Sequence, residues 1–284
     1  MRELLGEFWR PLTVFWRVPG RTGFPPPRWE HREIEVSVSD QDGPDLHERG
    51  DEHYERHEFD EAREAWMGAV EAGDSLAMAK IASLHEERGE LPAAIHWYRL
   101  AAAAGHVVSM YNLAMLLEDG DELEEAERWY RQAAAAGKGP AMHNLALVLV
   151  NRGDMVEAEA WYRRAADTGE GISMCNLGHL CLARGDLDGA EQWFRRGVDA
   201  GFVRAGLHLA RFLEERGDAE QARRWLRRAA EGGDVESMFV LARVLFYDRE
   251  FDEAARWGLR AAALGHAEAE QMFVVAPIMP LPTE

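Results

Sequence analysis

Two pairs of side chains are spaced so that they could do chemistry, and the first pair is Cys175 and His179. Residues four apart share one face of a helix, where an imidazole can take the proton of a thiol and make it nucleophilic. Such a nucleophile also needs an oxyanion donor, an acidic group to orient the imidazole or a glycine-rich elbow, and none accompanies this pair. We therefore predict no catalytic residue and a protein that is not an enzyme. An enzyme or enzyme subunit that uses Cys175 and His179 stays as an alternative, which a lowered pKa of the thiol would favour.

The second pair is His53 and His57, which have the four-residue spacing of metal ligands on a helix, with His47 nearby. Two ligands are too few for a metal site, and the sequence fixes no third. No phosphate-binding loop, dinucleotide fingerprint or zinc-protease motif occurs either. We therefore expect no metal and no cofactor.

The charge of the chain also limits the classes of partner that we expect it to bind. The formal net charge is −19, which repels the phosphates of nucleic acids, so we expect no nucleic acid partner. Residues 1–33 differ from the rest of the chain, with six Arg and four Glu.

No apolar run reaches the roughly 18 residues of a membrane span, and charged residues interrupt any signal-peptide core near the N-terminus. With two cysteines and only two Lys among 32 basic residues, we expect a cytoplasmic protein of bacterial type.

The elements that carry these residues repeat every 32 residues. In the stretch AERWYRQAAAAG, Ala126, Trp129, Tyr130 and Ala133 form one apolar stripe of a helix, which we call helix B. We expect the tryptophan of each copy to fill the gap between neighbouring helices, and the final glycine to cap the helix with a positive φ. The repeating glycines are Gly73, Gly105, Gly137, Gly169, Gly201, Gly233 and Gly265, and the repeating tryptophans are Trp97, Trp129, Trp161, Trp193, Trp225 and Trp257. Trp66 lies one place out of this register and aligns with Tyr98.

A second amphipathic segment, helix A, lies between each capping glycine and the next helix B. Its apolar positions also recur at 32-residue steps, and a turn marked by Gly89, Gly153, Gly185 or Gly217 follows it. One such hairpin cannot bury its apolar face alone, whereas stacked hairpins can. The sequence thus predicts an all-α, right-handed superhelical solenoid of about seven helix–turn–helix repeats. We assign the solenoid to residues 44–266, an aromatic and Pro-containing extended arm to 1–43, and a capping segment with a Pro-rich tail to 267–284.

The pattern A-x-x-W-Y-x-x-A-A-x-x-G, followed by A-M-x-N-L-A, resembles Sel1-like repeats, which are close relatives of tetratricopeptide repeats. The resemblance covers about residues 44–275. It departs from the usual pattern because the Gly-rich insertion in the turn is missing. Some secreted relatives have a disulfide in every repeat and bind β-lactams; this chain lacks those cysteines, so that activity is not carried over. The resemblance implies a scaffold or adaptor whose A helices line a concave surface and bind other proteins.

Helix A positions outside the repeating apolar frame are therefore the candidate binding residues. They are apolar in the middle repeats and basic in the later ones, which predicts a peptide or partner protein with apolar anchors and an acidic end near Arg211. The predicted partner-binding residues are Val108, Tyr111, Asn112, Met115, His143, Asn144, Leu147, Ile172, Asn176, His179, Arg204, His208, Arg211, Phe239 and Arg243.

Two alternatives remain open for parts of this set. The asparagines at 112, 144 and 176 either grip the backbone of a peptide or bridge groups within their own hairpins, and the basic residues either meet a ligand or pair with Glu214 and Glu215. The arm at 1–43 either packs on its own molecule or binds a partner. A structural homo-oligomer assembled through the arm is therefore a further alternative to the scaffold.

Overall fold

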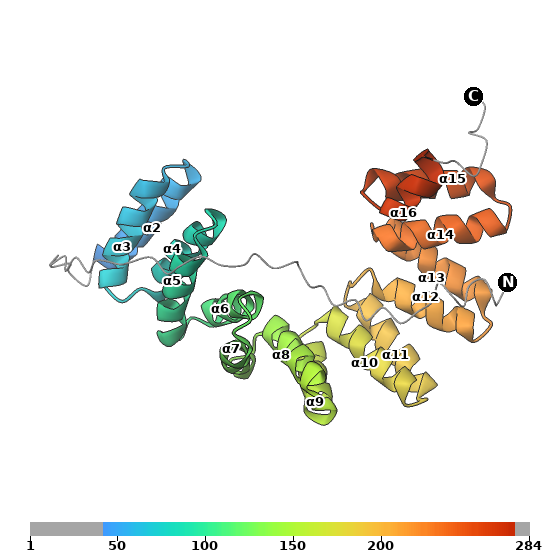
Figure 1. The fold of residues 1–284 in the computed structure, drawn as a ribbon, viewed down its shortest axis with the longest axis horizontal. Coiled ribbons are helices and arrows are strands. Elements are labelled where there is room, and N and C mark those ends of the chain that lie inside the picture. Colours follow the sequence, from blue (N-terminus) through green and yellow to red (C-terminus); the bar gives the residue numbers. More distant parts are fainter. Residues whose placement is uncertain (1–41, 276–284) are drawn as a thin grey trace. The chain divides into compact units, whose positions relative to one another are not determined.

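The computed structural model describes residues 42–275, and in this range every regular element is a helix (Figure 1). The predicted extended arm lies outside the described residues, apart from Asp42 and Gly43 at the start of the first helix, and so does the Pro-rich tail beyond residue 275. The helices are α2 (Asp42–Glu55), α3 (Phe59–Glu71), α4 (Ser75–Glu87), α5 (Leu91–Ala103), α6 (Val107–Asp119), α7 (Leu123–Ala135), α8 (Gly139–Arg152), α9 (Met155–Asp167), α10 (Gly171–Ala183), α11 (Leu187–Asp199), α12 (Ala205–Glu215), α13 (Ala219–Glu231), α14 (Val235–Tyr247), α15 (Phe251–Ala263), α16 (Ala267–Glu270) and the π-helix η1 (Gln271–Val275).

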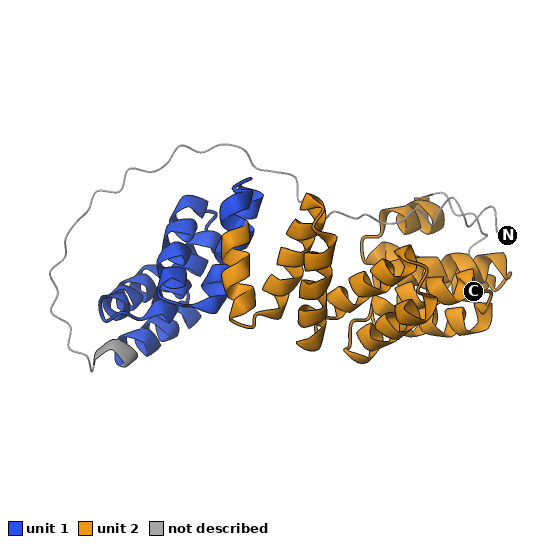
Figure 2. Ribbon diagram, turned by 90° about the horizontal axis from the view of Figure 1, so that it is seen from below, with its two compact units in different colours: residues 1–126 blue, residues 127–284 orange. Residues whose placement is uncertain are grey.

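The first fourteen helices form seven consecutive helix–turn–helix repeats, which confirms the number predicted from the sequence. The even-numbered helices α2 to α14 are the A helices, and the odd-numbered helices α3 to α15 are the B helices. The chain divides into two compact units, residues 1–126 and 127–284, with the boundary in the first turn of α7 (Figure 2). Within each unit, the two helices of a hairpin pack on each other, and the B helix also packs on the A helix of the next hairpin.

The glycines that end the B helices adopt the conformation expected from their spacing. From Gly73 to Gly265, all seven have φ between 83° and 99°. This left-handed conformation lets the backbone N–H of the following residue bond back to the helix, as Asp74 N–H does to the carbonyl oxygen of Ala69 at 3.1 Å. Each helical hairpin therefore ends at a position that favours glycine.

A second left-handed position lies in the turn between the two helices of each hairpin. Four hairpins have glycine there, whereas His57, Asp121 and Arg249 occupy the same register in the others with φ of 62°, 65° and 64°. A side chain in this conformation costs roughly 1–2 kcal/mol relative to glycine. Three of the seven hairpins therefore contain a strained turn residue.

We expect Arg249→Gly to raise the free energy of unfolding by about 0.5–1 kcal/mol, since relief of the turn strain exceeds the added freedom of the unfolded chain. Gly217→Ala is the matched reverse change, because a Cβ added to Gly217 would meet no atom within 4 Å and only the backbone conformation is tested. It should lower the free energy by about 1 kcal/mol. Urea unfolding followed by circular dichroism measures both; loss of stability in both variants would contradict the strain at Arg249.

The aromatic core differs from the prediction in its register. The repeating tryptophans from Trp97 to Trp257 are only half-buried, while the residue after each is buried: Tyr98, Tyr130, Tyr162, Phe194 and Leu226 are at most 4% exposed. The expectation that these tryptophans fill the gap between helices was wrong, because a step of 100° around the helix moves the next side chain to the centre of the interface. Trp66 fits this reading, since it shares the register of Tyr98 and is 2% exposed.

Four of these half-buried tryptophans have an arginine stacked over the ring. The guanidinium of Arg164 lies 4.2 Å from the ring centroid of Trp161, and that of Arg196 lies 4.3 Å from Trp193. Arg228 and Arg260 repeat the arrangement on Trp225 and Trp257. Each pair is a cation–π contact between residues three apart on a B helix, so this register faces partly toward water.

Ion pairs join the B helices α7, α9, α11 and α13 to the end of the next A helix. Arg152 contacts Glu127 at 2.9 Å and Arg216 contacts Glu191 at 3.1 Å, and Arg184 pairs with Glu159 in the same register. One repeat later the charges are exchanged, with Arg223 on the B helix and Asp248 at the end of the A helix. The arginine of most of these pairs is exposed, so each pair contributes little to stability, but a shifted pairing of hairpins would bring like charges together.

Candidate binding face

Three positions on each A helix lie on one face of the helix, at three, seven and ten residues after the capping glycine. In the second unit we call the twelve residues at these positions the A face. They are Pro140, Asn144 and Leu147 of α8, Ile172, Asn176 and His179 of α10, Arg204 at the N-cap of α12 with His208 and Arg211 of that helix, and Glu236, Val240 and Arg243 of α14.

Side-chain contacts connect successive A helices of this unit. His143 Nδ1 lies 2.8 Å from Ser173 Oγ between α8 and α10. His179 Nε2 lies 3.1 Å from His208 Nδ1 between α10 and α12, and one of these two nitrogens donates to the other. Arg204 Nε donates to Asp234 Oδ1, just before α14, at 3.0 Å. Successive A helices from α8 to α14 are therefore neighbours in this unit.

The apolar residues predicted for this surface are exposed. Leu147 and Ile172 in the second unit are each 41% exposed, as is Met115 in the first unit, where Val108 is 43% exposed. Burying such side chains against a ligand stabilises a complex by about 25 cal/mol per Å² of apolar area removed from water. These four residues are therefore able to contribute to binding.

Two predicted partner-binding residues are buried instead. His143 is 7% and Phe239 is 4% exposed, and both lie six residues after a capping glycine. Other residues in this register, Ala79, Cys175 and Leu207, are buried as well. The small and apolar side chains that most repeats have at this position were the available signal that it faces the interior. Tyr111 is the half-buried member of the register.

The asparagine ladder bonds to the tyrosines of the core. Asn144 Nδ2 donates to the hydroxyl of Tyr130 at 3.1 Å, Asn112 Nδ2 to that of Tyr98 at 3.3 Å, and Asn176 bonds to Tyr162. In each case the partner is the B helix of the preceding hairpin, so the ladder links hairpins and does not bridge within one. Burial raises the pKa of the Tyr98 and Tyr162 hydroxyls to about 12, so each stays protonated and can accept the amide hydrogen bond.

The basic residues of the A face have intramolecular partners. Besides the bond from Arg204 to Asp234, Arg211 Nε lies 3.5 Å from Glu215 Oε1, and the guanidinium of Arg243 lies 5.6 Å from the ring centroid of Phe239. Glu215 is exposed and one helical turn away from Arg211, which makes this ion pair weak. An acidic ligand would therefore compete with Glu215 at small cost and with the buried Asp234 at a larger one.

The environment of Cys175 argues against nucleophilic chemistry. The thiol is 2% exposed, and burial raises its pKa to about 12. At neutral pH it is therefore protonated, whereas a cysteine nucleophile requires a lowered pKa. This is opposite to the observation that would have favoured the pair of Cys175 and His179.

The N-terminal histidines have structural contacts in place of a shared metal. His53 lies on α2, but His57 lies in the turn that follows, so the two do not share one helical face. His53 Nδ1 lies 2.7 Å from Glu58 Oε2. Among the described residues, no three His, Cys, Asp or Glu side chains are placed to hold a metal ion together.

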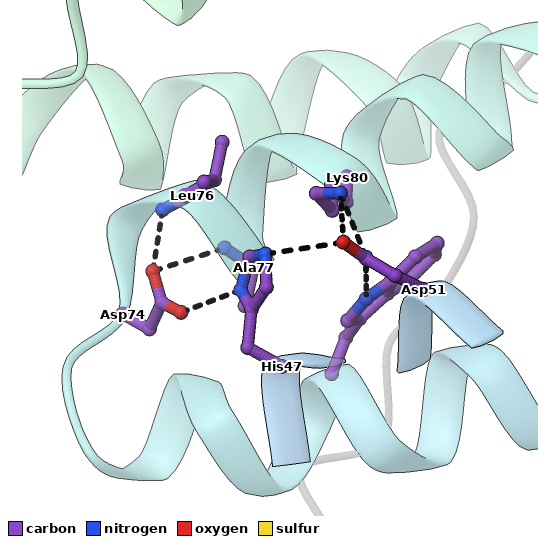
Figure 3. A network of polar contacts seen from close by, with 7 residues as sticks. His47, Asp51, Asp74, Leu76, Ala77 and Lys80 are labelled. Atoms are coloured by element: carbon purple, nitrogen blue, oxygen red, sulfur yellow. Dashed lines mark hydrogen bonds and ion pairs between the residues drawn. The ribbon is translucent and has the colours of Figure 1, made fainter. Parts of the chain in front are cut away.

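His47 belongs to a polar network that joins the first hairpin to the second (Figure 3). Its Nδ1 lies 2.7 Å from Asp74 Oδ2, and Asp51 receives a hydrogen bond of 2.7 Å from Lys80 Nζ. Burial by itself would raise the pKa of Asp74, but the backbone N–H groups of Ala77 and Leu76 and the imidazole of His47 outweigh it and lower the pKa. The carboxylate of Asp74 thus both caps α4 and fixes α2 against it.

No described helix is both long enough and apolar enough to cross a bilayer.

The repeated hairpins and the surface formed by their A helices define an α-solenoid protein of the helical-repeat class. Models of the tetratricopeptide repeat match residues 47–106, 141–170, 173–196 and 203–228, and the model of the Sel1 repeat matches residues 107–138 and 235–266. The chain therefore belongs to the tetratricopeptide and Sel1-like repeat family.

Solved structures agree with this assignment. A Sel1 repeat protein from Oxalobacter formigenes is 26% identical and has a TM-score of 0.64, over 76% of this chain and 99% of that one. A protective antigen of uropathogenic Escherichia coli with an SLR fold has a TM-score of 0.65 at 22% identity, over 81% of this chain. This chain spans 56% of the length of that antigen, and the likeness concerns the fold. A search of curated protein sequences found no match.

Proposed function

We propose that this protein is a non-enzymatic scaffold or adaptor that binds a peptide segment of a partner protein along the A face of residues 127–275. The observation that carries the proposal is a change of chemistry along one exposed register. Leu147 and Ile172 are exposed and apolar on α8 and α10. They are followed by Arg204 at the N-cap of α12, Arg211 on α12 and Arg243 on α14. A segment with apolar side chains followed by carboxylates would match this order.

The intramolecular contacts indicate which residues of the face are able to bind. The asparagines donate to buried tyrosines through Nδ2, and an amide oxygen is the type of group that accepts an N–H of a ligand backbone. Arg211 Nε lies 3.5 Å from the exposed Glu215, and an ion pair of this kind is weak, so a ligand carboxylate can compete with this contact. We therefore propose Ile172 as the apolar contact and Arg211 as the acidic-end contact. Both cysteines are free, which fits action in a reducing compartment such as the cytoplasm.

Selection of random peptides displayed on phage, with the full chain as the target, tests this proposal. We expect the selected peptides to combine apolar residues with Asp or Glu toward one end. The double variant Ile172→Glu with Arg211→Glu should bind them at least tenfold more weakly, because each lost contact is worth about 1–2 kcal/mol.

The matched control places the same charge change on B helices. Val156→Glu with Arg256→Glu alters two exposed residues of the same unit, on α9 and α15, by the same total charge. It should leave the affinity of the selected peptides unchanged. Equal weakening by both double variants, or no selected peptides with this composition, would rule out the A face as the binding surface.

A further inference from the structure

The acidic charge of the protein is concentrated in its first unit. Residues 42–126 contain 21 Asp and Glu but six Lys and Arg, a net charge of −15. Residues 127–275 contain 23 Asp and Glu and 20 Lys and Arg, a net charge of −3. Unequal charge of this size between two halves of one repeat array is not needed for folding, since the second unit forms the same hairpins without it. It indicates that the first unit attracts a cationic partner.

Exposed carboxylates and exposed apolar side chains lie on the same face of the A helices in this unit. Leu76 of α4 and Val108 and Met115 of α6 are 41–45% exposed. On the same face of these A helices, the carboxylates of Glu48 and Glu55 of α2, Glu87 of α4 and Asp119 of α6 are exposed. Lys80 lies on this face too, but its charge is paired with Asp51 at 2.7 Å.

The sequence contains one segment with the complementary composition, and it is attached to this unit. Residues 1–29 have five Arg and two Glu, a net charge of +3, together with six Phe and Trp. We propose that this segment docks on the A helices α2, α4 and α6 of its own molecule, with its arginines near the carboxylates and its aromatic rings on the exposed apolar residues. Arginine and aromatic side chains are the types most enriched at such contacts.

The connection to α2 makes this contact feasible at low intrinsic affinity. The segment between residue 29 and Asp42 can extend by about 3.3 Å per residue, or roughly 40 Å, which spans several helices packed 8–10 Å apart. A short covalent connection that is long enough to let the two sites meet gives an effective concentration on the order of millimolar. A dissociation constant of about 0.1 mM would then keep the segment docked about nine-tenths of the time.

Cleavage by an arginine-specific protease tests the proposal on the full chain. The segment contains Arg17, Arg21 and Arg28, none of which precedes a proline, and docking should slow cleavage at these sites about tenfold relative to a synthetic peptide of residues 1–33. The triple variant Glu48→Gln, Glu55→Gln and Glu87→Gln should restore fast cleavage. The matched control is Glu61→Gln, Glu64→Gln and Glu71→Gln, which neutralises three exposed carboxylates on the B helix α3 and should leave the protection intact.

A variant of the segment itself keeps the test independent of the folded array. Trp9→Ser with Trp16→Ser should also restore fast cleavage, and the full chain should remain monomeric by light scattering with protection that does not depend on concentration. If the protein is a dimer and protection of the segment from cleavage increases with protein concentration, the segment docks on a second copy and not on its own molecule. Cleavage as fast as in the free peptide, or equal release by both triple variants, would also overturn the proposal.

Discussion

Phe273→Ala is expected to lower the free energy of unfolding of the second unit by about 3–5 kcal/mol. The ring of Phe273 is 7% exposed and belongs to the core that α14 and α15 share. It fills the place beside Gly258, where a Cβ would come within 2.4 Å of the ring. Hairpins two to six fill this register with Tyr98, Tyr130, Tyr162, Phe194 or Leu226 of the B helix itself. In the last hairpin this position is Gly258, so η1, which follows that hairpin, supplies the missing side chain through Phe273.

Urea unfolding of this variant can be compared with Val275→Ala, which removes methyl groups from a residue of the same segment that is 72% exposed. That control should change the free energy of unfolding by less than about 0.5 kcal/mol. A second variant, Gly258→Leu in the Phe273→Ala background, should recover part of the loss, because Leu226 shows that leucine fits this register. A loss below 1 kcal/mol in Phe273→Ala would mean that the closing segment does not complete the core.

His143 should make the protein sensitive to mild acid. Burial lowers the pKa of its imidazole to about 4, whereas the unfolded chain has a value near 6.5. Below pH 6.5 the unfolded state therefore binds a proton that the folded state does not, and stability falls as the pH drops from about 6.5 toward 4. At pH 5 this one residue costs about 2 kcal/mol relative to pH 7.

His143→Gln removes the titration and keeps a polar group within reach of Ser173 Oγ. The difference in unfolding free energy between pH 7 and pH 5 should then be about 2 kcal/mol smaller than in the unchanged protein, as measured by urea unfolding at each pH. His96→Gln, at an exposed position on α5, serves as the control and should leave the pH dependence as it is. An unchanged pH dependence in His143→Gln would show that the imidazole is not buried in its neutral form.

The candidate face was partly predictable, because its exposed residues interrupt an otherwise regular apolar pattern. Leu147 and Ile172 were assigned to the surface from their place in the repeat, and they are exposed. His143 and Phe239 were assigned there as well, although their side chains face the interior. The pattern does not separate these cases, since a histidine or an aromatic residue can occupy either environment and its neighbours in the fold determine which one it occupies.

The sequence by itself determined the helices and their order. Glycines 32 residues apart favour left-handed backbone at each helix end, and that preference is local, so it can be inferred from residue types alone. Which side chains meet between hairpins was decided only by the tertiary structure. Tyr130 and not Trp129 became the core residue, Asn144 bonded to the preceding hairpin, and the ion pair at Arg223 and Asp248 exchanged its charges. These choices depend on how two hairpins are rotated against each other, a long-range geometry that no single repeat contains.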